Sequence, residues 1–415
     1  MKNFLVKKIK RCRVCGKNDF TKVFNFGPTP LANEFLKKGE VDKEESFFPL
    51  EVYFCNNCSF LELGHVVNPK ILFGNYVYVS STSQVFINHF KEFANSIFPR
   101  FNLNAKSLVI DIGSNDGILL KPFKVLSARV LGIEPAKHIA KVAEKEGIET
   151  IAEFFSANLA KKIVKEKGKA RIITATNVFA HIDDLDEVIK GLNELLLDDG
   201  VFIMEAPYLV DFIQKRYFDL VYHEHLSYWA IAPLMKLFKR FNMKVFDVIK
   251  VGAHGGSIRV FVEKSNGPYK IEKNIEKFIA LEKKYKLQSI DTYKEYVKKV
   301  YENKSKLISL LTKLKVKNKR IAAYGAPAKG NTLLNFFGIG NEMLDYVVDD
   351  SPWKQGLFTP GKKIPVVSSG KLYEDKVDYL LILAWNFADS IMKLHEKYKK
   401  LGGRFIIPVP KPKIV

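Results

Sequence analysis

The sequence predicts an α/β protein built from a small cysteine-containing module and two nucleotide-binding units. Each unit is a short apolar run, a turn of small or polar residues and a helical stretch, at residues 107–118 and again at 320–332. The cysteines indicate the module, because all four fall within the first sixty residues. We expect a zinc-binding module over 1–75, a central Rossmann-like domain over 76–265, and a helical connector with a second Rossmann-like α/β domain over 266–415.

The composition is that of a folded protein with more than one domain. A chain of 415 residues is too long for one ordinary core, and 47% hydrophobic with 27% charged residues excludes a disordered chain. We find no apolar run long enough to span a membrane and no secretory signal, so we expect a cytoplasmic protein without a membrane partner. The net charge of +21 is spread over amphipathic stretches such as 271–314, which favours solvated helix faces over a nucleic-acid surface. We expect a monomer that binds no nucleic acid.

The cysteines form two C-x-x-C pairs, Cys12 with Cys15 and Cys55 with Cys58. Each pair can turn two thiolates toward one point, and two pairs supply the four sulfurs of a tetrahedral zinc site. Two unrelated cysteine pairs, or disulfides, are the alternatives, although disulfides are rare in a cytosolic chain. Because protein would fill all four positions around the metal, we expect a structural zinc rather than a catalytic one.

The turn of the first α/β unit has the features of a cofactor site. The apolar run 107–112 is followed by Gly-Ser-Asn-Asp-Gly, and a second run, 130–133, ends at Glu134. Glycines at such a turn let a ligand approach the backbone, and an acidic residue after the second strand suits ribose hydroxyls. The turn is not G-x-G-x-x-G, and Asp111 would repel a pyrophosphate but attract the sulfonium and amino groups of S-adenosylmethionine. A turn without a cofactor is the alternative. The residues expected at the cofactor are Asp111, Gly113, Asn115, Asp116, Gly117, Glu134 and Asn177.

Residues 219–228 hold the densest set of proton-transfer side chains in the chain. If the segment is helical, the i, i+3 spacing puts Tyr222 and His225 on one face. Methylation of a carbon beside a carbonyl needs a base for the α-proton and a donor to the enolate oxygen. Histidine suits the first task, tyrosine the second, and Glu224 could orient the imidazole. His181 follows the strand expected at 171–176 and is a further candidate. A polar helix start without a catalytic role is the alternative.

The second α/β unit suggests an anion site. The strand expected at 320–324 leads into Gly-Ala-Pro-Ala-Lys-Gly-Asn-Thr and a helix, and a helix N-terminus with a lysine attracts anions. Further strands, expected at 343–348 and 379–385, end in acidic and amide side chains at the same edge of the sheet. A docking domain with an empty pocket is the alternative. The residues expected at the substrate are Ala326, Lys329, Asn331 and Asn386.

Taken together, these segments resemble the sugar-nucleotide C-methyltransferases. The motifs that carry the resemblance are CRVCG with CNNC, VIDIGSNDGIL, VYHEHLSYW, GGSIRVFVEK, and YGAPAKGNTLLN with VDDSPWKQG. They run from the cysteine pairs to the carboxy-terminal unit and so cover essentially the whole chain. Taken singly, VYHEHLSYW and GAPAKGNT are the most specific of them.

The resemblance implies a zinc-binding module, a central class I S-adenosylmethionine-dependent methyltransferase domain and a carboxy-terminal α/β domain that binds the nucleotide sugar. It implies that the substrate is a nucleoside-diphosphate keto-sugar and that His225 is the base, with Tyr222 and Glu224 close by. Tyr76 and His181 would line the sugar pocket. The loop with Lys329, together with Asn386, would meet the nucleoside diphosphate.

Three other functions are weighed against this one. An RNA methyltransferase would show a basic, aromatic-interleaved stripe and a catalytic cysteine or an Asn-Pro-Pro-aromatic motif, and we find neither. A small-molecule O-methyltransferase would need no second nucleotide-binding unit. An oxidoreductase using NAD at GAPAKG would be expected to carry G-x-G-x-x-G there.

Overall fold

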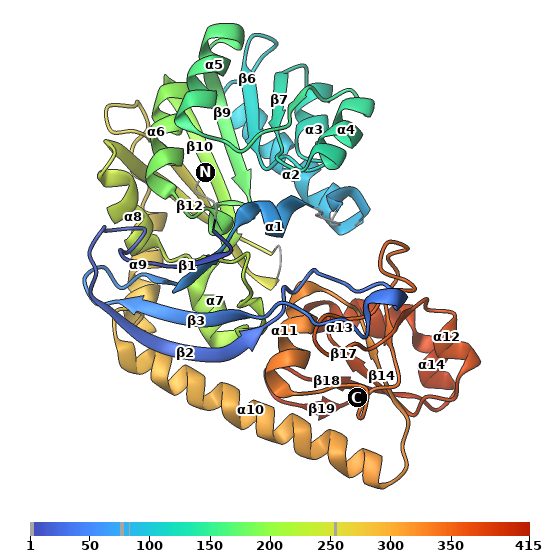
Figure 1. The fold of residues 1–415 in the computed structure, drawn as a ribbon. Coiled ribbons are helices and arrows are strands. Elements are labelled where there is room, and N and C mark those ends of the chain that lie inside the picture. The colour runs from blue at the N-terminus through green and yellow to red at the C-terminus, as the bar shows by residue number, and fades with distance from the viewer. Residues whose placement is uncertain (1–3, 75–78, 83, 253–254) are drawn as a thin grey trace.

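The computed structural model describes residues 4–74, 79–82, 84–252 and 255–415, which form four β-sheets. Figure 1 shows the amino-terminal strands, in blue, lying against both the green central domain and the red carboxy-terminal domain. Within this described part, no helix is both long enough and apolar enough to cross a membrane. The architecture is the α/β fold that the sequence predicts.

A seven-stranded sheet forms the centre of the molecule, in the order β12-β13-β10-β9-β6-β7-β8. β13 is antiparallel to both of its neighbours, whereas β6 to β10 run parallel to one another. From β6 the chain moves to β7 on one side and later to β9 on the other, so the crevice where ligands of open sheets bind lies at the end of β6. The strands are β6 (Leu108–Ile112), β7 (Arg129–Ile133), β8 (Thr150–Ile151), β9 (Ala170–Thr176), β10 (Leu196–Pro207), β12 (Met243–Val251) and β13 (Ser257–Lys264).

Helices cover both faces of this sheet (Figure 1). One core cluster holds apolar side chains of α2 and α3, and another holds those of α5, α6 and α8. Burial of the parallel strands on both faces explains why their sequences are almost continuously apolar. The helices are α2 (Gln84–Arg100), α3 (Leu120–Val125), α4 (Lys137–Lys145), α5 (Ala157–Lys167), α6 (Leu185–Leu195), α7 (Leu209–Lys215) and α8 (Ile231–Lys239), with 3-10 turns η3 (Phe179–His181) and η4 (Phe218–Leu220).

The amino-terminal module contributes a sheet in the order β11-β4-β3-β2. Its edge strand, β11 (Ser227–Tyr228), belongs to the central domain and pairs with β4, Ser227 opposite Glu62. The module is therefore joined by backbone hydrogen bonds to the chain directly after His225. The remaining elements are β1 (Val6–Lys8), β2 (Phe20–Thr29), η1 (Lys38–Glu40), β3 (Phe48–Cys55), β4 (Leu61–Leu63), β5 (His65–Val67), α1 (Pro69–Gly74) and η2 (Ser80–Thr82).

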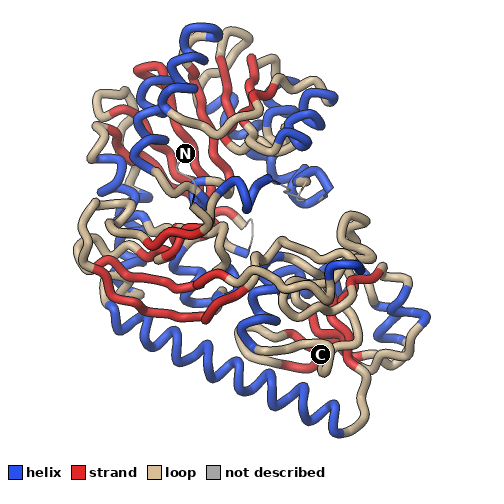
Figure 2. Tube along the Cα trace, in the orientation of Figure 1, coloured by secondary structure: helices blue, strands red, loops and turns tan. Residues whose placement is uncertain are grey.

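Two helices, α9 (Asn274–Lys284) and α10 (Ile290–Val316), connect the central and carboxy-terminal domains. Figure 2 shows α10 running along the strands of the amino-terminal module, and α10 contacts β2. The sequence predicts long helices over 271–314 with no glycine or proline to mark where one ends, and the structure has two helices there. The chain breaks between the helices because Lys286 adopts a positive φ of 51° and the Ser289 side chain accepts from the amide of Asp291 to begin α10.

The carboxy-terminal domain is a second α/β unit, with a six-stranded sheet in the order β16-β15-β14-β17-β18-β19. Strands β14 to β18 are parallel, and β14 lies at the centre with β15 and β17 on either side, so this sheet repeats the switch point of the first. Its elements are β14 (Ile321–Tyr324), α11 (Ala328–Phe337), β15 (Val347–Val348), β16 (Val366–Val367), α12 (Lys371–Glu374), β17 (Tyr379–Ile382), η6 (Trp385–Phe387), α13 (Ala388–Leu394), α14 (Glu396–Lys400), β18 (Arg404–Ile407) and β19 (Lys413–Ile414).

The three parts pack together through an aromatic junction. Phe24 and Phe26 of β2 lie 5.4 and 4.7 Å from Phe336 of α11, measured between ring centroids. The main core cluster contains residues from all three parts of the chain. The domain limits at 75 and 265 stay a prediction.

Candidate active site

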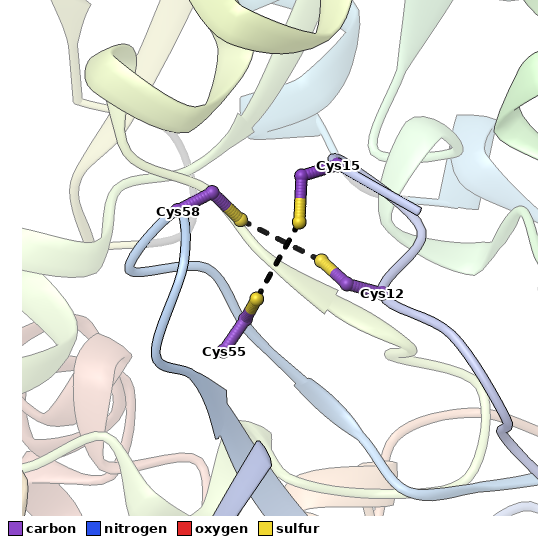
Figure 3. Close-up of side chains that lie close together, drawn as sticks. All are labelled: Cys12, Cys15, Cys55 and Cys58. Atoms are coloured by element: carbon purple, nitrogen blue, oxygen red, sulfur yellow. Dashed lines mark hydrogen bonds between the residues drawn. The ribbon is translucent and has the colours of Figure 1, made fainter. Parts of the chain in front are cut away.

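The four cysteines lie together with their Sγ atoms directed at one point (Figure 3). The Sγ atoms of Cys12 and Cys58 are 3.6 Å apart, those of Cys15 and Cys55 are 3.6 Å apart, and all four lie within 4.8 Å of one another. A tetrahedron with Zn–S bonds of about 2.3 Å has S–S edges of about 3.8 Å, so this set fits zinc. The same spacing excludes disulfides, whose S–S bonds are about 2.05 Å long. Four protein sulfurs would close the metal site, as a structural role requires.

A tight turn presents each cysteine pair. The amide of Gly16 donates to the carbonyl of Cys12, and the amide of Ser59 donates to the carbonyl of Cys55. Gly16 and Ser59 both have positive φ angles, 72° and 60°. The chain thus folds back behind each cysteine pair, so that both thiols of a pair face the other pair (Figure 3).

The glycine turn after β6 packs closely against neighbouring side chains. Gly113 and Gly117 have φ angles of +70° and +77°, where side chains are strained. A Cβ at Gly113 would lie 2.4 Å from Cγ2 of Val178, and one at Gly117 would lie 2.9 Å from Cγ1 of Ile148. Only glycine therefore lets the turn pack this closely.

Unpaired polar atoms surround this turn. Both carboxylate oxygens of Asp116 and Oδ1 of Asn177 are buried without a hydrogen-bond partner among the described residues. Buried acceptors without a partner are rare in folded proteins, so these atoms fit a ligand that supplies donors. The amino group and ribose hydroxyls of S-adenosylmethionine are such donors. Asn115, at a φ of 49°, accepts from the amide of Ser80 through Oδ1 and so holds η2 against the turn.

The two acidic residues of the unit differ in their surroundings. Glu134 accepts from the amides of Asn115 and Ala136, at 3.0 and 2.8 Å, so its carboxylate ties the end of β7 to the glycine turn. Asp111 is 2% exposed and accepts from the Thr174 hydroxyl over 2.6 Å. Burial raises the pKa of Asp111 to about 7. Asp111, on β6, is thus hydrogen-bonded to Thr174 of β9, and its contact with the cofactor stays a prediction.

The structure brings Tyr222 and His225 together, as the sequence predicts. The Tyr222 hydroxyl lies 2.7 Å from Nε2 of His225, and Nδ1 of His225 lies 2.8 Å from the carbonyl oxygen of Leu220. The segment is a turn and not a helix, since the amide of His225 donates to the carbonyl of Tyr222. The i, i+3 relation holds in such a turn just as it does in a helix.

The imidazole of His225 is oriented by a different group from the one expected. Glu224 is 4% exposed, and its Oε1 accepts from Nδ2 of Asn33 over 2.6 Å. Burial raises the pKa of Glu224 to about 7. The Leu220 carbonyl takes the orienting part that the sequence assigns to Glu224, because consecutive side chains in a turn point in different directions.

His181, at the end of η3, lies beside the proposed base. Its ring stacks on that of His225 with centroids 5.1 Å apart, and on that of Phe73 at 5.9 Å. Desolvation lowers the pKa of His181 to about 4. Tyr76, which the resemblance places in the same pocket, lies outside the described residues.

The carboxy-terminal loop differs in part from the expected anion site. Lys329 donates a hydrogen bond to the side chain of Asn386, so the two residues lie together, and their binding to an anion stays a prediction. The amide of Ala326 already donates to Asp349 over 2.6 Å. Asn331 is 1% exposed, and its side chain donates to the carbonyl of Ala32. Asn331 therefore lies in the junction with the amino-terminal module, because its position on α11 faces that module.

Two contacts that the sequence does not predict link the site to its neighbours. Asp219 is fully buried and accepts from the indole N–H of Trp385, and Asn33 reaches Glu224 from the amino-terminal module. Both contacts join positions more than 160 residues apart. The sequence signals that could have pointed to the contact between Asp219 and Trp385 are their positions, Asp219 three residues before Tyr222 and Trp385 directly before Asn386.

Three family models match successive parts of the chain. A zinc binding domain matches residues 12–73, a methyltransferase domain matches 86–248, and a C-methyltransferase C-terminal domain matches 252–410. The S-adenosylmethionine-dependent methyltransferase structure from Clostridium acetobutylicum aligns with 48% of this chain and 96% of its own, at 14% identity and a TM-score of 0.35.

Two curated relatives extend the comparison. The ubiquinone biosynthesis O-methyltransferase of Pelagibacter ubique is 26% identical over 121 residues, 29% of this chain and 50% of that protein. The C-methyltransferase NovU of Streptomyces niveus is 36% identical over 411 residues, 99% of this chain and 98% of that protein. The structural zinc and the S-adenosylmethionine cofactor agree with these matches. The chain therefore belongs to the S-adenosylmethionine-dependent C-methyltransferases that carry an amino-terminal zinc-binding domain.

Proposed function

We propose that this C-methyltransferase acts on a carbon beside the ketone of a keto-deoxysugar linked to a nucleoside diphosphate. A carbon acceptor has no lone pair, so a proton must leave before the methyl group can be taken. The observation that carries the proposal is the hydrogen-bonded chain from Tyr222 through His225 to the Leu220 carbonyl. These two hydrogen bonds link a base, the imidazole, to an acid, the tyrosine hydroxyl.

His225 is the proposed base, and its basic atom is Nε2. The Leu220 carbonyl can only accept, so Nδ1 of the neutral imidazole carries the proton and Nε2 carries the lone pair. In this structure the Tyr222 hydroxyl donates to that lone pair. When the hydroxyl turns to the ketone oxygen, Nε2 becomes available for the α-proton and the tyrosine stabilises the enolate.

The surroundings of His225 favour this role. A cationic neighbour would oppose the positive charge that the base acquires, but the lowered pKa of His181 keeps that stacked ring neutral at pH 7. Behind the imidazole, Leu220, Ala180 and Ser227 help to line a cavity of about 20 Å³. This cavity has room for about one water molecule and none for a sugar, so the substrate has to approach from elsewhere.

The cofactor would be held by the chain's turn after β6. S-adenosylmethionine, when bound, supplies a methyl group on a positively charged sulfur. Gly113 and Gly117 let it approach the backbone, and Asp116 offers unpaired acceptor atoms. Glu134, at the end of β7, would accept hydrogen bonds from the ribose hydroxyls.

Lys329 and Asn386 are proposed to meet the diphosphate, at the amino-terminal end of α11. Desolvation lowers the pKa of Lys329 to about 8, while the nearby charge of Asp219 raises it. A diphosphate would add negative charge beside the ammonium group and favour its protonated form. The positive amino-terminal end of α11 would attract the negatively charged diphosphate as well.

Ligand-induced stabilisation tests the proposed substrate class, because a ligand that binds the folded state raises the melting temperature. S-adenosylhomocysteine and a nucleoside diphosphate should each raise the Tm of the purified protein, and a keto-deoxysugar nucleotide should gain one methyl group on carbon. Stabilisation by NAD but not by S-adenosylhomocysteine would contradict the proposal. So would a product methylated on oxygen.

A further inference from the structure

The carboxy-terminal domain touches the segment that holds the proposed base. The indole N–H of Trp385, the first residue of η6, donates to Oδ2 of Asp219 over 2.6 Å. Asp219 is the middle residue of η4 and is fully buried. A charge-assisted hydrogen bond in such surroundings is among the stronger contacts between two domains.

The residue after Asp219 is the one that orients His225. The Leu220 carbonyl accepts from Nδ1 of His225, and Leu220 is the last residue of the same 3-10 turn. A displacement of η4 would therefore move this carbonyl and change the angle of its hydrogen bond. Hydrogen bonds weaken steeply with angle, and a shift of about 1 Å in a reacting group can cost up to about 100-fold in rate.

The carboxy-terminal domain also fixes η4 through its aromatic side chains. The ring of Phe218 stacks on Phe337 of α11 with centroids 5.0 Å apart, and the ring of Tyr217 lies 4.9 Å from that of Trp385. The Lys329 ammonium lies 4.9 Å from the Trp385 ring centroid, and Asp219 is its counter-charge. The proposed diphosphate ligand Lys329 and the turn that orients His225 thus share one contact, Trp385 to Asp219.

We propose that Trp385 and Asp219 are positioning residues for His225 and couple the nucleotide-binding loop to the base. Trp385 acts through Asp219, Asp219 acts through the backbone of η4, and the Leu220 carbonyl acts on the imidazole. This inference rests on the proposed function of His225. It assigns a catalytic consequence to a tryptophan of the carboxy-terminal domain that does not touch the reacting atoms.

Trp385→Phe tests the inference, because phenylalanine keeps a ring for Tyr217 and Lys329 but removes the N–H donor. We expect kcat to fall roughly 10- to 150-fold, the value of a hydrogen bond to a charged group. The KM values for the methyl donor and for the keto-sugar nucleotide should stay within about twofold of the wild-type values, since ground-state binding is unchanged.

Two further variants separate positioning from general damage. Asp219→Asn keeps an oxygen for the indole N–H and should retain most turnover, whereas Asp219→Ala should lose as much as Trp385→Phe. Arg216→Met is the matched control, because Arg216 donates to the carbonyl of Pro410 across the same domain boundary without touching Asp219. Its kcat should stay near that of the wild type.

A double-mutant cycle makes the test independent of folding. In a His225→Ala background Trp385→Phe should cause no further loss in kcat, because a residue that acts through His225 has nothing left to position. An equal loss in both backgrounds would overturn the inference, and so would an unchanged kcat in Trp385→Phe alone. A His225→Ala enzyme with near wild-type turnover would instead contradict the proposed base itself.

Discussion

The imidazole rings of His181 and His225 stack with their planes at 27° and their centroids 5.1 Å apart. Two histidines in such contact cannot both be charged without mutual repulsion. Because desolvation lowers the pKa of His181 to about 4, the His181 ring is neutral at pH 7 and does not oppose a positive charge on His225. We propose that the two histidines have different roles, His225 as the base and His181 as its uncharged neighbour.

His181→Phe keeps a neutral ring against His225 and removes both ring nitrogens. If His181 serves as an uncharged support, turnover should stay within about 10-fold of the wild type, well short of the 10²–10⁴-fold that general-base help is worth. Steady-state kcat of His181→Phe and His225→Phe, measured side by side, checks this. Equal losses in the two variants would show that a proton passes through His181.

Metal analysis should find about one zinc per chain, as expected for a single closed site of four sulfurs. Cys58→Ser removes one ligand and should lower the zinc content and loosen the amino-terminal module first, because ligand bonds and folding are linked. Faster hydrogen exchange at β3 and β4 would report this. Since β11 pairs with β4 directly after His225, kcat should fall as well. A zinc-free protein with four ordinary thiols would contradict the assignment.

Glu134→Ala should weaken binding of S-adenosylhomocysteine by roughly 1.5–3 kcal/mol, the value of a charge-assisted hydrogen bond. Glu134→Gln keeps an oxygen acceptor and should lose less. The matched control is Glu153→Ala, because Glu153 is exposed just beyond β8 in the same sheet. Titration calorimetry measures all three variants. An unchanged dissociation constant in Glu134→Ala would remove Glu134 from the cofactor site.

The stability of the protein should depend on pH through Glu224. Its pKa is about 7 in the folded protein and near the ordinary value of 4.5 for a glutamate when unfolded, so between these values the folded state retains a proton that the unfolded state has lost. The Glu224 contribution to the free energy of unfolding therefore falls as pH rises from 4.5 to 7 and is level above that range.

Glu224→Gln cannot titrate but keeps an oxygen for Nδ2 of Asn33. Its stability relative to the wild type should grow between pH 4.5 and 7, by up to about 3 kcal/mol. Urea unfolding of both proteins from pH 4 to 8 provides the measurement, with the exposed Glu153→Gln as the control. Parallel stability curves for the wild type and Glu224→Gln would refute the assigned pKa.

The local patterns of the chain predict most of the fold. Apolar runs followed by glycine turns locate β6 and β14, and the C-x-x-C pairs locate the zinc site. Local patterns do not predict the break between α9 and α10, because neither glycine nor proline occurs between Lys284 and Ile290. Nor do they predict the pairing of Ser227 with Glu62, since a strand of two residues is too short to show an alternation of polar and apolar side chains.

The residues of the candidate site also differ in whether the sequence reveals them. Side chains that act through their own chemistry, such as Tyr222 and His225, are visible in the sequence because their spacing places them together. The Leu220 carbonyl is not visible, because a backbone oxygen has no residue signature. Trp385 and Asp219 meet only after two domains have packed, so no short-range pattern relates them.

The most direct test of proton abstraction by His225 uses the keto-sugar nucleotide in D2O without the methyl donor. The wild-type enzyme should exchange the α-proton for deuterium, and mass spectrometry or NMR of the recovered nucleotide measures the rate. His225→Ala should lose roughly 10²–10⁴-fold in this rate, while S-adenosylhomocysteine binds it as tightly as it binds the wild type. Tyr222→Phe should exchange more slowly than the wild type but faster than His225→Ala. Exchange by His225→Ala at the wild-type rate would contradict the assignment of the base.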